Sequence, residues 1–103
     1  MSVYLLTSLR GPGWVPNRSR REQDGWDAHA TFMDALVDDG FVILGGPIGD
    51  GENAMLAIEA NDEREIEQRF AADPWTTNGV LRIGKIEQWT IWLDSREVRR
   101  HPD

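Results

Sequence analysis

The sequence predicts an α+β fold of the ferredoxin-like βαββαβ type, an antiparallel sheet with two helices on one face. Strand-like and helix-like apolar patterns follow one another in that order along the chain. The 103 residues suffice for one two-layer core and not for two, and 40% hydrophobic residues with five tryptophans are typical of a globular protein. We expect one domain over residues 1–94 and a charged tail over residues 95–103.

The charge balance argues against several partners. Aspartate and glutamate number 18 against 11 lysines and arginines, and the formal charge of -7 repels phosphate backbones and anionic membranes. We therefore expect no nucleic-acid partner and no membrane partner. The chain has no cysteine, which excludes disulfides and thiolate chemistry. No basic region with a long apolar segment behind it opens the chain, so we expect a cytoplasmic protein.

The first predicted strand covers residues 3–9 and ends at Arg10-Gly11-Pro12-Gly13, which cannot continue a strand. Residues 11–25 are polar, contain two prolines and three glycines, and are predicted to form a long loop. Loops of this length in compact domains are uncommon and are often functional.

A helix is predicted after this loop, with Asp24 as its cap and Asp27 in its first turn. Gly40 is expected to end it. His29 precedes the apolar positions by three and four residues, so it should point toward the core with them. These positions are Phe32, Met33, Leu36 and Val37.

Residues 41–44 form a short apolar run, which predicts a buried strand ended by Gly45-Gly46-Pro47. Residues 49–53 are rich in turn formers, and residues 55–58 are the next strand-like run. We expect the two strands to pair as a hairpin.

Asp62 and Glu65 have capping-box spacing at the start of the second helix, whose buried stripe is Ile66 and Phe70. The helix should end at Asp73-Pro74. Residues 80–93 are predicted as a long last strand with a bulge near Gly84, where the alternation of apolar residues is interrupted.

One face of this sheet is left without a helix. Side chains alternate between the two faces along a strand, and Trp89 and Trp92 are three residues apart, so they point to opposite faces of the last predicted strand. One of the two therefore lies on the face without helices, whichever way the strand is oriented. Because large exposed apolar faces usually mark an interface, we expect a homodimer that packs sheet to sheet.

His29 is the first candidate for chemistry, since histidine alone titrates near neutral pH without perturbation. The alternative is a histidine that serves packing and hydrogen-bonds a backbone carbonyl. Asp73 before Pro74 could be a simple turn former, or it could orient His29 if the two helix ends share one edge of the sheet. The carboxylates Asp27 and Asp34 do not complete a metal-ligand set with His29, so we expect no metal.

Gly46 and Pro47 are either a plain strand exit or a place where backbone comes close to a ligand. The glycines do not form a dinucleotide fingerprint. The loop arginines are either a solvated face or a means of holding a substrate carboxylate or phenolate. They are Arg18, Arg20 and Arg21.

These residues resemble a known family. The pattern H-x-x-F-x-x-x-L-x-x-x-G-x-x-x-x-x-G-P, followed by Ala72-Asp73-Pro74-Trp75 and a last strand ending near Trp89, is similar to that of the YciI-like (YCII-related) proteins. The pattern is filled by His29, Phe32, Leu36, Gly40, Gly46 and Pro47. The loop over residues 11–25 is longer than the link usual in that family. The segment between Pro47 and the next predicted strand, residues 48–53, is short.

The resemblance implies a dimeric α/β-barrel of ferredoxin-like protomers, with a pocket centred on His29 and Asp73. One branch of the family is similar to cofactor-free dehydrochlorinases of chlorinated hydroxyhydroquinones. We take Gly46, Pro47, Trp75 and Arg20 as candidate substrate contacts. The leading hypothesis is a cofactor-independent lyase or isomerase for a small aromatic or enol-type molecule. The alternatives are a non-catalytic ligand-binding or regulatory dimer and a vestigial pocket.

Overall fold

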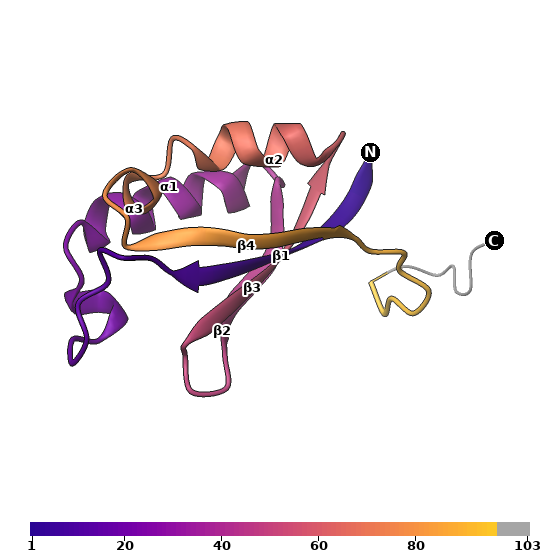
Figure 1. Ribbon diagram of the computed structural model, residues 1–103. Helices are drawn as coiled ribbons and strands as arrows, with labels where there is room; N and C mark the ends of the chain where they lie inside the picture. The colour runs from indigo at the N-terminus through magenta and orange to yellow at the C-terminus, as the bar shows by residue number, and fades with distance from the viewer. Residues whose placement is uncertain (97–103) are drawn as a thin grey trace.

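The computed structural model describes residues 1–96 as an antiparallel sheet covered on one face by helices (Figure 1). The strands lie in the order β2-β3-β1-β4, and every neighbouring pair is antiparallel. The elements are β1 (Ser2–Arg10), the 3-10 helix η1 (Arg20–Glu22), α1 (Trp26–Asp38), β2 (Val42–Ile48), β3 (Asn53–Ala60), α2 (Glu63–Phe70), α3 (Pro74–Thr77) and β4 (Leu81–Gln88). The predicted ferredoxin-like α+β fold is confirmed. Most of the predicted tail, residues 97–103, lies outside the described residues.

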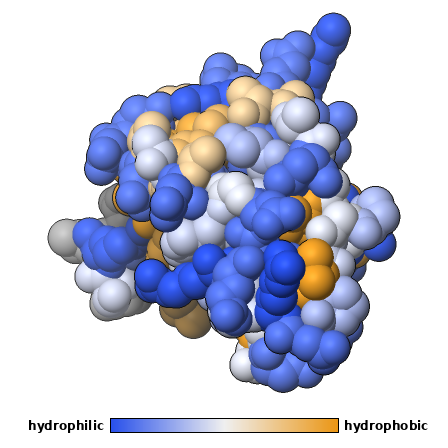
Figure 2. Space-filling model, turned by 90° about the vertical axis from the view of Figure 1, so that its left-hand side faces the viewer, coloured by the Kyte–Doolittle hydropathy of each residue, from blue (hydrophilic) through white to orange (hydrophobic). Residues whose placement is uncertain are grey.

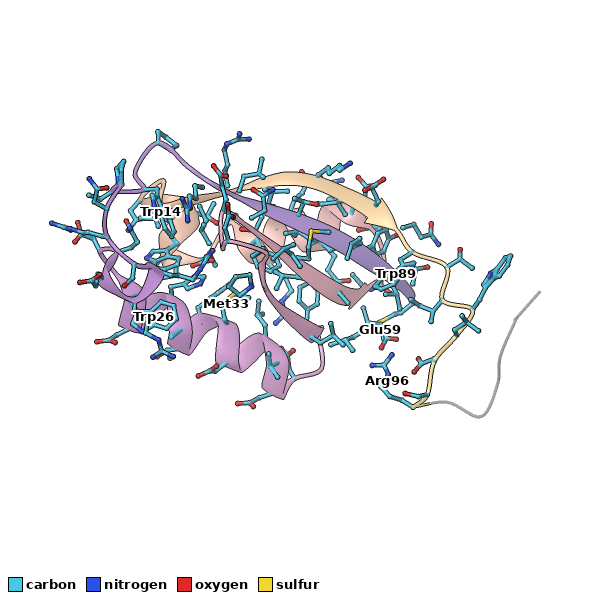
Figure 3. The ribbon with its side chains drawn as sticks, turned by 90° about the horizontal axis from the view of Figure 1, so that it is seen from below. Trp14, Trp26, Met33, Glu59, Trp89 and Arg96 are labelled. Atoms are coloured by element: carbon cyan, nitrogen blue, oxygen red, sulfur yellow. The ribbon has the colours of Figure 1, made fainter. Side chains whose placement is uncertain are left out.

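The core lies between the helices and the face of β1 and β3 that they cover. Ile58 and Ile66 have no exposed surface, and Met33 projects from α1 toward the sheet (Figure 3). Val37 was predicted in the buried stripe and is 50% exposed. The reason is geometric, because Val37 is turned by about 100° from buried Leu36. No helix among residues 1–96 is long and apolar enough to cross a membrane.

Strand β2 runs through Gly45-Gly46-Pro47 to Ile48, so the predicted strand end at Leu44 is wrong. The strand is at the edge of the sheet, where proline is tolerated because one side of the strand has no partner. Gly45 lies opposite Leu56, and a Cβ at Gly45 would clash with Leu56 Cδ2 and come within 2.9 Å of the backbone carbonyl oxygen of Met55. Packing against β3 therefore requires this glycine.

Strand β4 contains the predicted bulge. Thr7 pairs with Lys85 and Ser8 with Ile83, which leaves Gly84 as the extra residue. The strand ends at Gln88, so the predicted extension to residue 93 is wrong. Gln88 already pairs with Tyr4 near the start of β1, and little of β1 remains to pair with residues beyond it.

The start of α2 agrees with the prediction, whereas its end and the start of α1 do not. The helix α2 ends at Phe70, three residues before the predicted end at Asp73-Pro74, and the separate short helix α3 begins at Pro74. Asp62 caps α2, where its Oδ1 accepts from the Glu65 amide over 2.9 Å. Gly25, with φ +81°, is the N-cap of α1, so the prediction of Asp24 as the cap is wrong. The carbonyl of Asp24 instead accepts from the indole of Trp75 over 2.6 Å, which fixes its peptide away from a capping position.

Candidate active site

The side chains of His29 and Asp73 meet where α1 and α3 begin. The Nδ1 atom of His29 lies 2.9 Å from Oδ1 and 3.0 Å from Oδ2 of Asp73. His29 is on the first turn of α1, and Asp73 immediately precedes α3. Both side chains are buried, with 8% and 2% of their surface exposed. The fold therefore brings together the two residues on which the predicted site depends.

Asp73 is held by the helix that it caps. Its Oδ1 also accepts a hydrogen bond from the Trp75 amide over 2.9 Å at the N-terminus of α3. An ionised carboxylate only accepts hydrogen bonds, so we assign the Nδ1 atom of His29 as the protonated nitrogen, which donates to Asp73. The Nε2 atom then carries the free lone pair.

Nε2 of His29 is accessible. Among residues 1–96 no buried side-chain nitrogen or oxygen lacks a hydrogen-bond partner. Nε2 has no hydrogen-bond partner among these residues, which means that it is not sealed off from the cavity that His29 lines. A proton acceptor is thus presented to any molecule that enters.

Tryptophans surround the back of the imidazole. The ring of Trp75 stacks on that of His29 with centroids 4.0 Å apart and planes 11° apart. The ring centroid of Trp26 lies 6.0 Å from that of His29 and 5.6 Å from that of Trp75. Trp75 has no exposed surface and does not line the cavity, so this predicted substrate contact stands behind His29.

The cavity has a volume of about 250 Å³ and lies between α1, α3 and the sheet. Its polar lining includes His29, Asp73 and Arg20, and Gly46 and Pro47 form part of its wall. The larger apolar side chains around it are Leu6, Trp26, Met33, Leu56, Phe70, Leu81 and Ile83. Within the described residues no three potential metal-ligating side chains gather at one point. The geometry suits a small, mainly apolar molecule.

The loop over residues 11–25 is organised by Gln23, a residue that the sequence reasoning missed. Its side chain is 2% exposed and hydrogen-bonds the amide and carbonyl of Val15 over 2.8 and 2.9 Å, and the carbonyl of Arg18 over 3.1 Å. A polar glutamine in a polar loop carries no sequence signal of burial. The loop is thereby fixed in shape and carries Arg20 to the cavity wall.

The fold and the site define a ferredoxin-like α+β protein with a buried histidine–aspartate pair at an apolar pocket. A family model for the YCII-related domain matches residues 4–90, and the chain belongs to this family. A search of the curated proteins finds no match.

One similar solved structure is the 5-chloro-2-hydroxyhydroquinone dehydrochlorinase (TftG) from Burkholderia phenoliruptrix AC1100, in complex with 2,5-dihydroxybenzoquinone. The two chains are 22% identical, and the alignment covers 85% of this chain and 94% of that chain with a TM-score of 0.63. This likeness supports the fold described above.

Proposed function

We propose that the protein is a cofactor-independent enzyme of the lyase or isomerase kind, in which His29 moves a proton of a small aromatic or enol-type substrate. One observation carries the proposal. Both oxygens of Asp73 lie within hydrogen-bond distance of Nδ1 of His29, while Nε2 has no hydrogen-bond partner in the described part of the chain and the imidazole lines a mainly apolar cavity. This is the arrangement of an oriented general base.

In this scheme Nε2 of His29 takes a proton from the substrate. The resulting imidazolium is stabilised by the carboxylate of Asp73 and by the indole face of Trp75, stacked at 4.0 Å. The same nitrogen returns the proton in an isomerisation, or keeps it while a leaving group such as chloride departs in an elimination. Gly46, Pro47 and Arg20 would contact the substrate, since all three line the cavity.

The size of the catalytic effect limits the substrate. General acid/base catalysis by one placed group contributes roughly 10²–10⁴-fold. Such a contribution is sufficient for phenols, enols and lactones, whose protons or leaving groups are already activated. Amides and phosphate esters need a larger rate enhancement than one such group provides.

The proposal is tested with two reactions. One is chloride release from 5-chloro-2-hydroxyhydroquinone, the compound in the name of the similar structure. The other is deuterium exchange at the carbon next to the carbonyl of a cyclic ketone, followed by NMR. Turnover of either compound above the buffer rate supports the proposal. A pocket that binds such compounds without turning any over favours a ligand-binding or regulatory protein.

Asp73→Asn is expected to lower turnover by roughly 10²-fold or more, since the amide cannot balance the charge of a protonated His29. The amide oxygen can still accept from the Trp75 amide, so the N-cap of α3 is kept. The rate on the same substrate and the circular dichroism spectrum are compared for the two proteins. Unchanged turnover in a folded variant would contradict the role of Asp73 as a charge-balancing partner.

We also propose a homodimer formed through the open face of the sheet. Leu44 and Trp89 are 62% and 45% exposed there, and a hollow lined by these two residues, Val3 and Ala57 lies on the same face. Trp89 lies at the opposite end of the molecule from Trp14 (Figure 3). Dimerisation would remove this apolar surface from water.

Leu44→Glu is expected to convert the dimer into a monomer, because it places an unpaired charge in the proposed interface. Light scattering at micromolar concentration measures the mass. The matched control is Val37→Glu, a similarly exposed position, at 50%, on α1. A monomeric native protein, or the same mass for all three proteins, would refute this interface.

A further inference from the structure

Two arginines that lie 41 and 31 residues from Gly51 in the sequence converge on this residue at the tip of the β2–β3 hairpin. Nη2 of Arg20 donates to the carbonyl oxygen of Gly51 over 3.0 Å, and Nη2 of Arg10 donates to the same oxygen over 3.3 Å. Both guanidinium groups also lie over the ring of Trp14, with Cζ atoms 5.3 and 4.4 Å from its centroid. The two positively charged guanidinium groups therefore share one neutral carbonyl oxygen and one indole ring as their contacts.

No carboxylate of residues 1–96 lies within ion-pair distance of Arg10 or Arg20. The arginines that do pair within this part of the chain are Arg18, Arg69 and Arg96. The carboxylate of Asp50 lies near the hairpin tip, and its Oδ1 accepts from the Glu52 amide. Burial and the neighbouring charge of Arg10 lower the pKa of Arg20. In a chain of net charge -7, two close cations that form no ion pair within residues 1–96 are suited to bind an external anion.

Arg20 stands where two hollows meet. It lines the cavity of His29, and it also lines an adjoining hollow together with Arg10, Trp14 and Gly51. Pro47 lines both hollows as well. The surface at this end of the molecule is mainly hydrophilic (Figure 2). A molecule whose apolar part lies beside His29 would have its polar end near Arg20.

We propose that Arg20, assisted by Arg10, binds the carboxylate of a substrate whose aromatic or enol-type part lies in the His29 cavity. The choice of substrate class rests on the proposed function, whereas the anion site itself does not. A planar guanidinium pairs with a carboxylate through two parallel hydrogen bonds, which a neutral group cannot form. The carboxylate replaces the Gly51 carbonyl as the acceptor for Arg20.

The test compares benzoate with benzamide, a neutral probe of nearly the same shape. Binding is followed by calorimetry and by the fluorescence of the tryptophans beside both hollows. We expect benzoate to bind about tenfold more tightly than benzamide. Arg20→Gln should remove this preference, and Arg10→Gln should reduce it by a smaller factor. Arg64→Gln, which removes one exposed positive charge on α2, should leave it unchanged.

Arg20→Lys keeps the positive charge and loses the two parallel N–H donors of the guanidinium. We therefore expect it to lower the affinity for benzoate several-fold in a folded protein. His29→Asn should keep the preference for benzoate, which separates failure of the anion site from failure of the proposed reaction. Equal affinity for the two probes, no benzoate binding at millimolar concentration, or a preference that survives both Arg20 substitutions would overturn the proposal. Loss of the preference in Arg64→Gln would also overturn it, since general charge would then explain the binding.

Discussion

Replacing His29 with asparagine is expected to reduce turnover by roughly 10²–10⁴-fold, the contribution of a placed general base. The amide nitrogen of asparagine can occupy the place of Nδ1 and donate to Asp73, so the buried carboxylate keeps a partner. What is lost is Nε2, the only atom of the residue that can take the proton of a substrate. The measurement is kcat for the substrate identified by the chloride-release or exchange assay, together with the thermal unfolding curve.

A matched control is available for this experiment. The chain has two histidines, and the other is His101, which lies outside the described residues. His101→Asn should leave turnover unchanged. A His29→Asn protein that has the thermal unfolding midpoint of the native protein and retains its turnover would contradict the role of His29 as the general base.

Trp75→Ala is expected to lower the free energy of unfolding by about 3–5 kcal/mol, the range for deleting a large aromatic side chain from a core. Trp75 has no exposed surface, stacks on His29 and donates from Nε1 to the carbonyl of Asp24. The variant loses the stacking and the hydrogen bond, and it leaves a cavity beside the imidazole of His29. Urea unfolding at equal protein concentration measures the change, and Tm should fall by roughly 12 °C or more.

Trp75→Phe separates stacking from hydrogen bonding at the same position. The phenyl ring can still stack on His29, and Asn78 still donates to the carbonyl of Asp24 over 3.3 Å. We therefore expect a loss of only about 1–2 kcal/mol in the free energy of unfolding. If the alanine and phenylalanine variants are equally stable, Trp75 does not hold the site together by stacking.

The elements were predictable because their signals are local. The cap at Asp62 depends on a residue three positions away, and the bulge at Gly84 shows as a break in a period of two. The predictions failed where a neighbour in space overrides the local signal. Gly45-Gly46-Pro47 reads as a strand end, yet an edge position beside β3 keeps it in the sheet.

By itself the sequence determined the fold class, the family resemblance and the choice of His29 and Asp73 as candidates. Only the tertiary structure decided how these residues meet, because they are 44 positions apart and no local rule sets their distance. The same holds for Arg20 and Gly51, which are 31 positions apart. Contacts of this kind depend on strand order, register and helix packing, which are properties of the whole chain.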